Sequence, residues 1–545
     1  MGKGKKRPRH LPRGRQPDAA AMGELAALLG DNPPLERTHL IEHLHLIQDA
    51  HGHVPARLLV ALAQIMKLSL ADVFETVRFY EHFDYVDDGE KPPEPVTIRV
   101  CTSLPCAMAG AEELLTELRA QAGGHVRVIE ASCMGGCDKA PFAMAGRRRL
   151  GRASADELAQ CAAQGRLNAV IPACEDFGQY MERGGYAAFG QVRKGQIGLE
   201  DLLARMEAAG LRGMGGAGFP AHVKWRAVAA QEGTKYIVIN ADEGEPGTFK
   251  DRHILERTPH RVLEGALIAA AALKAQGIYI YLRDEYPHIL SILSRETGLL
   301  EDLHIVAKNY IHLRRGAGAY VCGEESALIE SLEGKRGWPR QRPPFVSTRG
   351  LFGRPTLVHN VETISWLPAI ARGEVKGTLP CAFSVCGRVA RPGVYQAPPG
   401  TTARQLIAMA GGMADGEELL AFLPGGASGG ILPAALADEP LDFGSLEKHG
   451  AFVGSHALIV LSRRDDLKEA ARNLIAFFAA ESCGQCTPCR EGCKQAEALL
   501  QGESWDRRLL EDLGAVMRDG SICGLGQAAP NGFLSLLRHF PKVLS

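Results

Sequence analysis

A run of four cysteines near the end of the chain constrains the fold more than any other feature. The stretch ESCGQCTPCREGC spans residues 481–493 and spaces its thiols as C-x2-C-x2-C-x3-C. In bacterial ferredoxins with this spacing, three cysteines bind one iron–sulfur cluster and the fourth binds a second cluster. A second run of this kind is absent from the sequence. The pattern therefore predicts one cluster, whose fourth ligand must be found elsewhere.

The first three thiols of the run are expected to bind three corners of a [4Fe–4S] cluster: Cys483, Cys486 and Cys489. Cys493 is expected one turn further on, along the flank of the helix REGCKQAEALL. Cys523 follows the next predicted helix and precedes Gly524, which permits a close backbone approach. We assign Cys523 as the fourth ligand, and the local four-cysteine run that includes Cys493 is the alternative.

A second group of thiols lies near the other end of the chain. Cys101 and Cys106 form C-x4-C, and Cys133 and Cys137 form C-x3-C. Each pair begins where a predicted strand ends, so two adjacent parallel strands would bring all four thiols to one point. Four thiolates suit either zinc or an iron–sulfur cluster, and the spacing alone leaves both open.

Cysteine usage and apolar patterning indicate the cellular setting. Fourteen cysteines in a chain of 545 residues without a secretory signal favour metal ligation over disulfides. The most apolar stretch, 266–282, is interrupted by Lys274 and is too short to span a bilayer. We expect a soluble, cytoplasmic protein. The cysteines outside the two groups are expected to be small buried hydrophobic residues: Cys161, Cys174, Cys322, Cys381 and Cys386.

The charge balance excludes nucleic acid as the main partner. Lys and Arg number 62 against 63 for Asp and Glu. Basic residues are concentrated at 2–15, and we expect a disordered tail there. His39 and His43 have the i, i+4 spacing of metal ligands, but we expect a partly packed or solvated helix face.

Hydrophobic periodicity predicts an α/β multidomain protein. The expected segments are a basic tail at 1–22, helices at 23–90, a strand-and-helix domain with the first cysteine group at 91–165, a glycine- and tyrosine-rich linker at 166–194, an α/β domain at 195–372, a β-rich domain around one helix at 373–460 and a helical region at 461–545.

A glycine-rich loop at 210–220 predicts an anion site. Gly213, Gly215 and Gly218 form G-x-G-x-x-G, but the preceding segment is helical, so the loop fails the strand context of a dinucleotide fingerprint. The loop leads into a helix that begins at Pro220 and carries Lys224. Backbone N–H groups, a helix N-terminus and an ammonium group together suit a phosphate.

Three further polar turns are expected in the same domain. NADEGEPGTFKDR (240–252) follows a strand, and its carboxylates suit either a solvated turn or hydrogen bonds to ribose or ribitol hydroxyls. GAGAYVCGEESALIESLEG (316–334) places Glu324 and Glu325 at a helix start, where acidic residues also stabilise the helix dipole. GLFGRPTLVHNVETI (350–364) adds Asn360 and Thr363. Beside an iron–sulfur module, these turns favour a redox nucleotide pocket.

Five motifs together resemble the NADH-oxidising flavoprotein of respiratory complex I, with its thioredoxin-like [2Fe–2S] partner fused in front. They are GMGGAGFP, NADEGEPGTFKDR, GEESALIESLEGKRG, ESCGQCTPC and SICGLGQ. The resemblance covers nearly all of residues 30–540. The fusion, with LIEHLHLIQD, YIYLRDEYP and LDFGSLEKHGAFVGSHALIVLS, is most similar to the β subunit of NAD-dependent formate dehydrogenases that contain tungsten or molybdenum. The diaphorase subunit of NAD-reducing hydrogenases is a near relative.

The resemblance implies the cofactors and their residues. It implies a thioredoxin-like domain at 91–165 and an SLBB-like β-grasp domain at 373–460. The implied [2Fe–2S] ligands are Cys101, Cys106, Cys133 and Cys137, and the implied [4Fe–4S] ligands are Cys483, Cys486, Cys489 and Cys523. The implied FMN and NAD contacts are Gly213, Gly215, Gly216, Ala217, Gly218, Phe219, Lys224, Asn240, Asp242, Glu243, Glu245, Tyr320, Gly323, Glu324, Glu325, Phe345, Asn360 and Thr363. Departures from the family pattern are His359 in place of Asn, Arg342 in place of Lys, and the additional Cys493.

The chemistry explains this combination of cofactors. Nicotinamide transfers a hydride, an iron–sulfur cluster passes single electrons, and a flavin does both. By the resemblance, we expect a diaphorase subunit that passes electrons from a formate dehydrogenase α subunit, which holds tungsto- or molybdopterin and iron–sulfur clusters, through its own clusters to FMN and NAD+. Carboxylates near the ribose favour NAD over NADP. The alternatives are a hydrogenase diaphorase, a fused complex I-type subunit, a flavin-less iron–sulfur carrier and a zinc scaffold.

Overall fold

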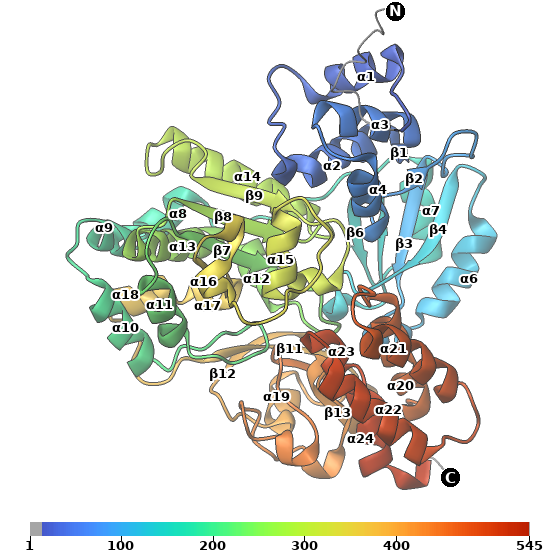
Figure 1. The fold of residues 1–545 in the computed structure, drawn as a ribbon. Coiled ribbons are helices and arrows are strands. Elements are labelled where there is room, and N and C mark those ends of the chain that lie inside the picture. The colour runs from blue at the N-terminus through green and yellow to red at the C-terminus, as the bar shows by residue number, and fades with distance from the viewer. Residues whose placement is uncertain (1–13, 544–545) are drawn as a thin grey trace, which may run out of the picture.

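The computed structural model describes residues 14–543 (Figure 1). Residues 1–13 of the predicted tail therefore lie outside the described residues. The first helix, α1 (Ala19–Leu29), begins inside the segment predicted to be a disordered tail. The Asp18 side chain caps this helix by accepting from the Ala21 backbone N–H at 2.6 Å, and Ala21 and Leu25 are fully buried. The predicted boundary at residue 22 is therefore wrong.

The N-terminal helices cover one end of the molecule, coloured dark blue in Figure 1. They are α1, α2 (Leu40–His51), α3 (Ala56–Ile65) and α4 (Leu70–Phe79), with a short parallel pair of strands, β1 (Val54–Pro55) and β2 (Tyr85–Val86). His43 is buried in α2, and its Nε2 lies 2.7 Å from the Pro34 carbonyl oxygen. The prediction of a packed helix position is confirmed for His43.

The next domain carries the first cysteine group. Its sheet has the order β4-β3-β5-β6, from β3 (Val96–Cys101), β4 (Val126–Ala131), β5 (Phe142–Ala145) and β6 (Arg148–Gly151). Helices α5 (Leu104–Ala107), α6 (Ala111–Gln121) and α7 (Ala155–Ala163) complete the domain. As predicted, β3 and β4 are adjacent and parallel, so both cysteine pairs follow the same edge of the sheet.

The segment predicted to be a linker is instead partly helical and packed. It forms α8 (Phe177–Glu182) and α9 (Ala187–Arg193), which lie against α13 (Pro259–Leu273). Gly184 and Tyr186 have positive φ angles and separate the two helices. Tyr180, Tyr186 and Phe189 are buried in the α/β core. The glycines mark a turn between helices, and the aromatic residues provide core contacts.

The central domain is built on a parallel sheet of order β10-β7-β8-β9. Its strands are β7 (Tyr236–Ala241), β8 (Gly277–Leu282), β9 (Ile311–Arg315) and β10 (Thr356–Asn360). The other helices of this domain are α10 (Leu199–Ala208), α11 (Ala221–Ala229), α12 (Lys250–Arg257), α14 (Pro287–Asp302), α15 (Glu325–Leu332), α16 (Val346–Arg349), α17 (Val361–Ser365) and α18 (Leu367–Arg372). The register pairs Asn240 with Asn360 at the carboxyl ends of neighbouring strands, where α/β sheets bind their ligands.

The last two regions lie side by side in the lower part of Figure 1, with the C-terminal helices on the right. A sheet of order β12-β11-β15-β13-β14, with α19 (Ala403–Met409), is built from β11 (Cys381–Gly387), β12 (Gly393–Ala397), β13 (Leu419–Ala427), β14 (Leu432–Pro433) and β15 (Ala457–Ser462). The C-terminal helices are α20 (Leu467–Ala480), α21 (Thr487–Leu500), α22 (Arg507–Gly520), α23 (Gly524–Ala528) and α24 (Asn531–His539). Both regions have the predicted class of secondary structure.

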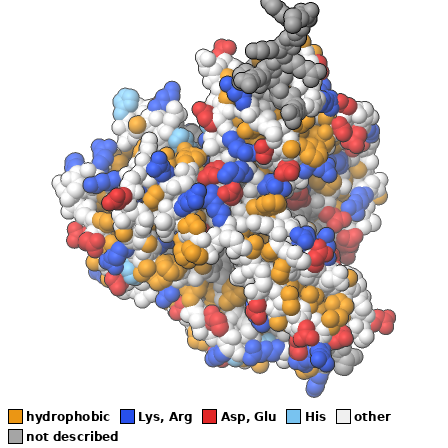
Figure 2. Space-filling view, in the orientation of Figure 1, with side chains coloured by type: hydrophobic (Ala, Val, Ile, Leu, Met, Phe, Trp, Pro, Cys, Tyr) orange, Lys and Arg blue, Asp and Glu red, His pale blue; other side chains and the backbone are white. Residues whose placement is uncertain are grey.

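The surface and the scattered cysteines complete the description. Acidic and basic side chains are interspersed on the face seen in Figure 2, in line with the balanced charge. No helix among residues 14–543 is both long and apolar enough to cross a membrane. Of the five scattered cysteines, Cys161, Cys322, Cys381 and Cys386 are buried as predicted, whereas Cys174 is partly exposed. The prediction was wrong for Cys174 because its segment runs along the surface before α8.

Candidate functional site

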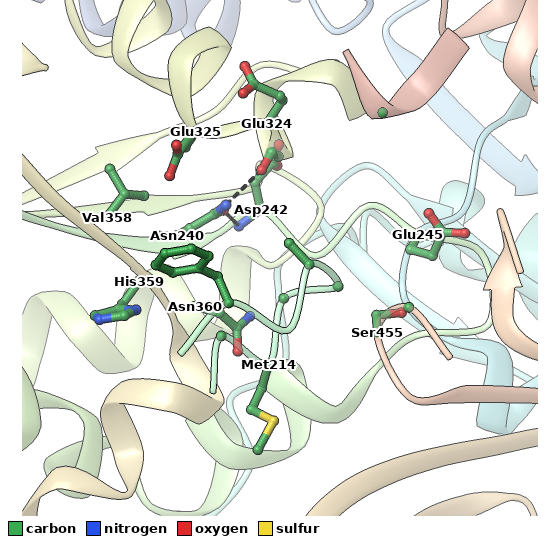
Figure 3. Close-up of a pocket in the computed structure, with 18 of the residues that line it drawn as sticks. Met214, Asn240, Asp242, Glu245, Glu324, Glu325, Val358, His359, Asn360 and Ser455 are labelled. Carbon is green, nitrogen blue, oxygen red and sulfur yellow. Dashed lines mark hydrogen bonds between the residues drawn. The ribbon is translucent and has the colours of Figure 1, made fainter. Parts of the chain in front are cut away.

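A cavity of about 800 Å³ lies at the carboxyl ends of β7 and β10 (Figure 3). This volume is within the range of pockets that hold small-molecule cofactors. One wall is the glycine-rich loop, a second is the turn after β7, and a third is the start of α15. The β-rich domain contributes residues near Gly425 and Gly454, and the C-terminal region contributes Cys523 and Leu525. Three regions of the chain therefore meet around one cavity.

Hydrogen bonds within the glycine-rich loop hold it open toward the cavity. The Gly213 N–H donates to the Phe219 carbonyl oxygen at 2.8 Å, and the Gly218 N–H donates to the Gly213 carbonyl oxygen at 3.1 Å. Gly213, Gly215 and Gly216 line the cavity together with Ala217. Helix α10 precedes the loop, which agrees with the predicted failure of the dinucleotide fingerprint. The bonds within the loop do not use the N–H groups of Gly215, Gly216 and Ala217, which line the cavity and suit an anion.

Two residues predicted to contact the cofactor, Thr363 and Gly218, support this loop. The Thr363 hydroxyl accepts the Met214 N–H at 2.9 Å and is only 1% exposed. Gly218 has φ +62°, and a Cβ there would lie 2.5 Å from the Phe443 ring. Neither residue lines the cavity. Both positions therefore hold the loop in place, and their direct contact with a cofactor stays a prediction.

The carboxylates of the acidic turn after β7 differ in the groups that they bind. Both oxygens of the buried Glu243 carboxylate accept backbone N–H groups at the start of α12, from Asp251 at 2.7 Å and Arg252 at 3.0 Å. The Tyr286 hydroxyl also donates to Glu243. This carboxylate therefore stabilises a helix start. Glu243 also lines the cavity, and its contact with a cofactor stays a prediction.

Glu245 lies at the cavity wall near Ser455 (Figure 3). Its Oε1 accepts the Ser428 backbone N–H at 2.7 Å and the Ser428 hydroxyl at 2.5 Å, and its Oε2 accepts the Tyr320 hydroxyl. Glu245 and Tyr320 thus join the acidic turn to the loop before α15. Asn240 makes a second link, because its Nδ2 donates to the Gly323 carbonyl oxygen at 2.8 Å.

Charged groups on the cavity wall are mostly paired. The Lys224 ammonium lies 2.7 Å from Glu325. Glu324 caps α15 by accepting the Ser326 and Ala327 N–H groups, and it also pairs with Arg342. Burial raises the pKa of Asp242 to about 8, although the nearby Arg283 acts in the opposite direction. Asp242 lines the cavity, and its Oδ2 is buried and has no partner within the described residues.

Two exposed aromatic side chains stand at the cavity. Phe219 and Phe345 line it and are 52% and 54% exposed. Large aromatic side chains are usually buried more deeply than this, so exposure of both at one pocket indicates a surface for stacking a planar ligand.

The first cysteine group converges as predicted. Its four thiols are at most 3% exposed. Cys133 Sγ lies 3.4 Å from Cys137 Sγ, and Cys101 is within hydrogen-bonding reach of both Cys106 and Cys133. No three His, Cys, Asp or Glu side chains among residues 14–543 surround a single-ion position. A connected set of four thiols fits a group with four cysteine ligands.

The second cysteine group lies beside the cavity. Cys483, Cys486 and Cys489 lie immediately before and at the start of α21, and Cys523 precedes α23. Burial and the charge of the nearby Cys483 raise the pKa of Cys523, to about 12. Cys523 also lines the cavity. Cys493 is fully buried inside α21, as the helical pattern predicts.

Comparison with known proteins then identifies each region. Residues 206–369 match the Nuo51 FMN-binding domain, 26–165 the thioredoxin-like [2Fe–2S] ferredoxin, 383–432 the SLBB domain and 469–545 the NADH-ubiquinone oxidoreductase-F iron-sulfur binding region. An NADH-quinone oxidoreductase subunit of Rhizobium meliloti is 37% identical over 400 residues, which cover 68% of this chain and 94% of that protein. The chain belongs to the complex I 51 kDa NADH-binding flavoprotein family.

Further relatives agree. The mitochondrial NADH-ubiquinone oxidoreductase 51 kDa subunit of Neurospora crassa is 40% identical over 374 residues, which cover 63% of this chain and 76% of that protein. A chain of an NAD+-reducing [NiFe]-hydrogenase, in its air-oxidised state, superposes with a TM-score of 0.81 at 32% identity, covering 94% of both chains. The predicted fold classes and the cofactors FMN, NAD, [2Fe–2S] and [4Fe–4S] are confirmed. The protein is an NADH-oxidising flavin and iron–sulfur oxidoreductase subunit.

Some cavity residues are not evident from the sequence. Ser428 and Ser455 belong to the β-rich domain, which the sequence predicts as a separate unit, yet both reach the cavity. The glycine-rich stretch GGASGG at 425–430 was the available signal. His359 also lines the cavity, although in the sequence it is only a departure from the family pattern.

Proposed function

We propose that this chain is the diaphorase β subunit of an NAD-dependent formate dehydrogenase. It would exchange electrons reversibly with a catalytic α subunit that holds tungsto- or molybdopterin and iron–sulfur clusters. The observation that carries the electron-transfer role is the shared wall between Cys523 and the cavity. A one-electron site next to a pocket for a two-electron carrier is what a diaphorase requires. The choice of formate rests on the similarity of the fused N-terminal region and the YIYLRDEYP motif.

We propose the following residues for the cofactor sites. The [2Fe–2S] ligands are Cys101, Cys106, Cys133 and Cys137, and the [4Fe–4S] ligands are Cys483, Cys486, Cys489 and Cys523. The FMN residues are Gly213, Gly215, Gly216, Ala217, Lys224, Asn240, Asp242, Tyr320, Gly323, Glu324, Asn360 and Thr363, and the NADH residues are Phe219, Glu245, Glu325 and Phe345. Gly218 and Glu243 complete the cofactor pocket.

In this proposal, the chain's own groups bind the cofactors and orient them. FMN, when bound, supplies the change from hydride transfer to single-electron transfer. The amides of the glycine-rich loop, at the entrance to α11, and Lys224 hold a phosphate. Glu245 is held by Ser428 and Tyr320 so that its carboxylate accepts hydroxyl groups of the nucleotide. Phe219 and Phe345 cover the planar rings and exclude water.

Isolation of the native complex tests the choice of substrate. The large subunit that copurifies with this chain would be identified, and NAD+ reduction would be measured with formate and, separately, with hydrogen. Formate-dependent reduction supports the proposal. Hydrogen-dependent reduction would instead establish a hydrogenase diaphorase, the alternative supported by the 94% coverage of the hydrogenase chain.

A further inference from the structure

His359 stands where the family pattern has an asparagine, and the structure gives it a defined geometry. It lies in β10 next to Asn360, is 4% exposed, and lines the cavity (Figure 3). The indole Nε1–H of Trp225 donates to His359 Nε2 at 2.9 Å. Trp225 is fully buried in α11, the helix that follows the glycine-rich loop. The imidazole is therefore anchored on the side away from the cavity.

This contact determines the tautomer of His359. An indole N–H can only donate, so Nε2 must be the acceptor. In a neutral imidazole with Nε2 as the acceptor, Nδ1 carries the hydrogen. Burial and the nearby Lys224 ammonium both lower the pKa of His359, far below its usual value, and the ring stays neutral. Trp225 thus fixes an Nδ1–H donor.

The remaining nitrogen is directed to open space in the cavity. Within residues 14–543, the hydrogen bonds of the His359 ring involve Nε2 only. Nδ1 is also not among the fully buried polar atoms that lack a partner, so it keeps some accessibility. Because the residue lines the cavity, that accessibility faces the ligand space.

We propose that the Nδ1–H of His359 donates a hydrogen bond to a phosphate oxygen of FMN and that Trp225 is its positioning residue. The inference rests on the proposed binding of FMN in this cavity. A phosphate is favoured over the flavin ring because His359 lies close to Lys224 and to the helix that follows the glycine-rich loop. The amide of an asparagine could donate in the same way, but its two ends can exchange by rotation. His359 cannot make that exchange without losing the Trp225 contact.

Flavin-free protein tests the inference by titration with FMN and with riboflavin, which lacks the phosphate. H359N keeps a donor and should bind FMN within about threefold of wild type. The double variant W225F/H359L removes both partners, so no buried indole N–H is left unpaired, and it should lose about tenfold in FMN affinity. Its affinity for riboflavin should match that of wild type.

Two further variants separate positioning from packing. W225F alone should lie between wild type and the double variant for FMN, because the tautomer is no longer imposed. W366F makes the same change at Trp366, whose Nε1 has no partner within the described residues, and should bind FMN normally. Retained iron content and circular dichroism check that each variant is folded.

Each outcome decides a different point. Unchanged FMN affinity in W225F/H359L would overturn the inference. An equal loss for FMN and riboflavin would place the donor at the flavin ring and overturn the phosphate assignment. Failure of the wild-type protein to bind FMN would instead reject the proposed cofactor site.

Discussion

The two cysteine sites of this chain differ in burial and in what surrounds them. The thiols of the N-terminal site, Cys101, Cys106, Cys133 and Cys137, are at most 3% exposed and follow the strands of a sheet. In the C-terminal site, Cys483, Cys486 and Cys523 are partly exposed, and only Cys489 is buried. The C-terminal site lies beside short loops and helix starts rather than at a sheet edge.

Their surroundings suggest different roles. The guanidinium of the buried Arg283 donates to the Cys133 carbonyl oxygen at 2.6 Å, and the partly buried Arg149 donates to the Met134 carbonyl oxygen at 2.9 Å, so two cations contact the backbone of the N-terminal site. Among the described residues, none of its four thiols lines the large cavity, whereas Cys523 does. A site with one side at the cavity and another partly exposed can connect a bound flavin to a partner protein. We therefore expect electrons to pass between the partner protein and the flavin through the C-terminal site.

The largest effect is expected from the fourth ligand of the C-terminal site. Cys523→Ser should lose or convert the [4Fe–4S] cluster, because it removes a thiolate from the side of the site that faces the cavity. Cys493→Ser should keep the cluster, since that thiol lies one turn further along α21 than Cys489 and is fully buried. Iron content and EPR spectra of the two variants measure this. Loss of the cluster in Cys493→Ser alone would restore the local four-cysteine run as the ligand set.

The roles of the two sites are separable by a coupled assay. Replacing Cys486 should abolish formate-dependent NAD+ reduction in the complex with the α subunit, while NADH-dependent ferricyanide reduction is largely retained. Replacing Cys106 should reduce the coupled rate much less, because its site does not border the cavity. Circular dichroism of both variants controls for folding. Equal loss of coupled activity in both would show that the two sites act in series.

The contrast in burial predicts a difference in stability. Asp138, next to Cys137, is partly buried and forms an ion pair with the buried Arg252 at 2.7 Å. Asp138→Asn should lower the free energy of unfolding by about 3 kcal/mol, because it leaves a buried guanidinium without its main partner. Asp519, near the C-terminal site, pairs with Arg518 at 3.4 Å while both are largely exposed, and Asp519→Asn should cost less than about 1 kcal/mol. Denaturant unfolding measures both, and similar costs would contradict the contrast.

Residues whose place follows from motif spacing were predicted from the sequence better than residues whose partners come from tertiary packing. Cysteine spacing and the strand pattern were sufficient to place Cys101 and Cys133 after adjacent parallel strands. The roles of Glu243 and Thr363 could not be read from motifs, because the groups that they bind are brought to them by the tertiary fold. The linker prediction failed for a similar reason. Glycines in 176–190 suggested flexibility, whereas burial of its aromatic side chains in the α/β core stabilises two helices.

The smallest effect is expected at the Glu245–Tyr320 contact, in the wall between the nucleotide pocket and the two cysteine sites. Tyr320 donates its hydroxyl to Glu245, and its backbone N–H donates to Glu481 at 2.9 Å, two residues before Cys483. Tyr320 also lines a second, small polar cavity, and Cys133 is another of its lining residues. The Glu245–Tyr320 contact is therefore positioned between both cysteine sites and the nucleotide pocket.

Glu245→Gln tests whether this contact serves the nucleotide or only the fold. The glutamine carbonyl oxygen can still accept from Ser428, and its amide can donate to the Tyr320 hydroxyl, so the wall should persist. The variant loses one charged acceptor, and NADH binding should weaken by about 1.5 kcal/mol, or roughly tenfold. FMN content and both cluster signals should remain. Glu418→Gln, at an exposed pair with Arg463, is the matched control and should bind NADH normally. Wild-type NADH affinity in Glu245→Gln would show that Glu245 only joins the loops, and loss of a cluster signal would show that the wall supports the cysteine sites themselves.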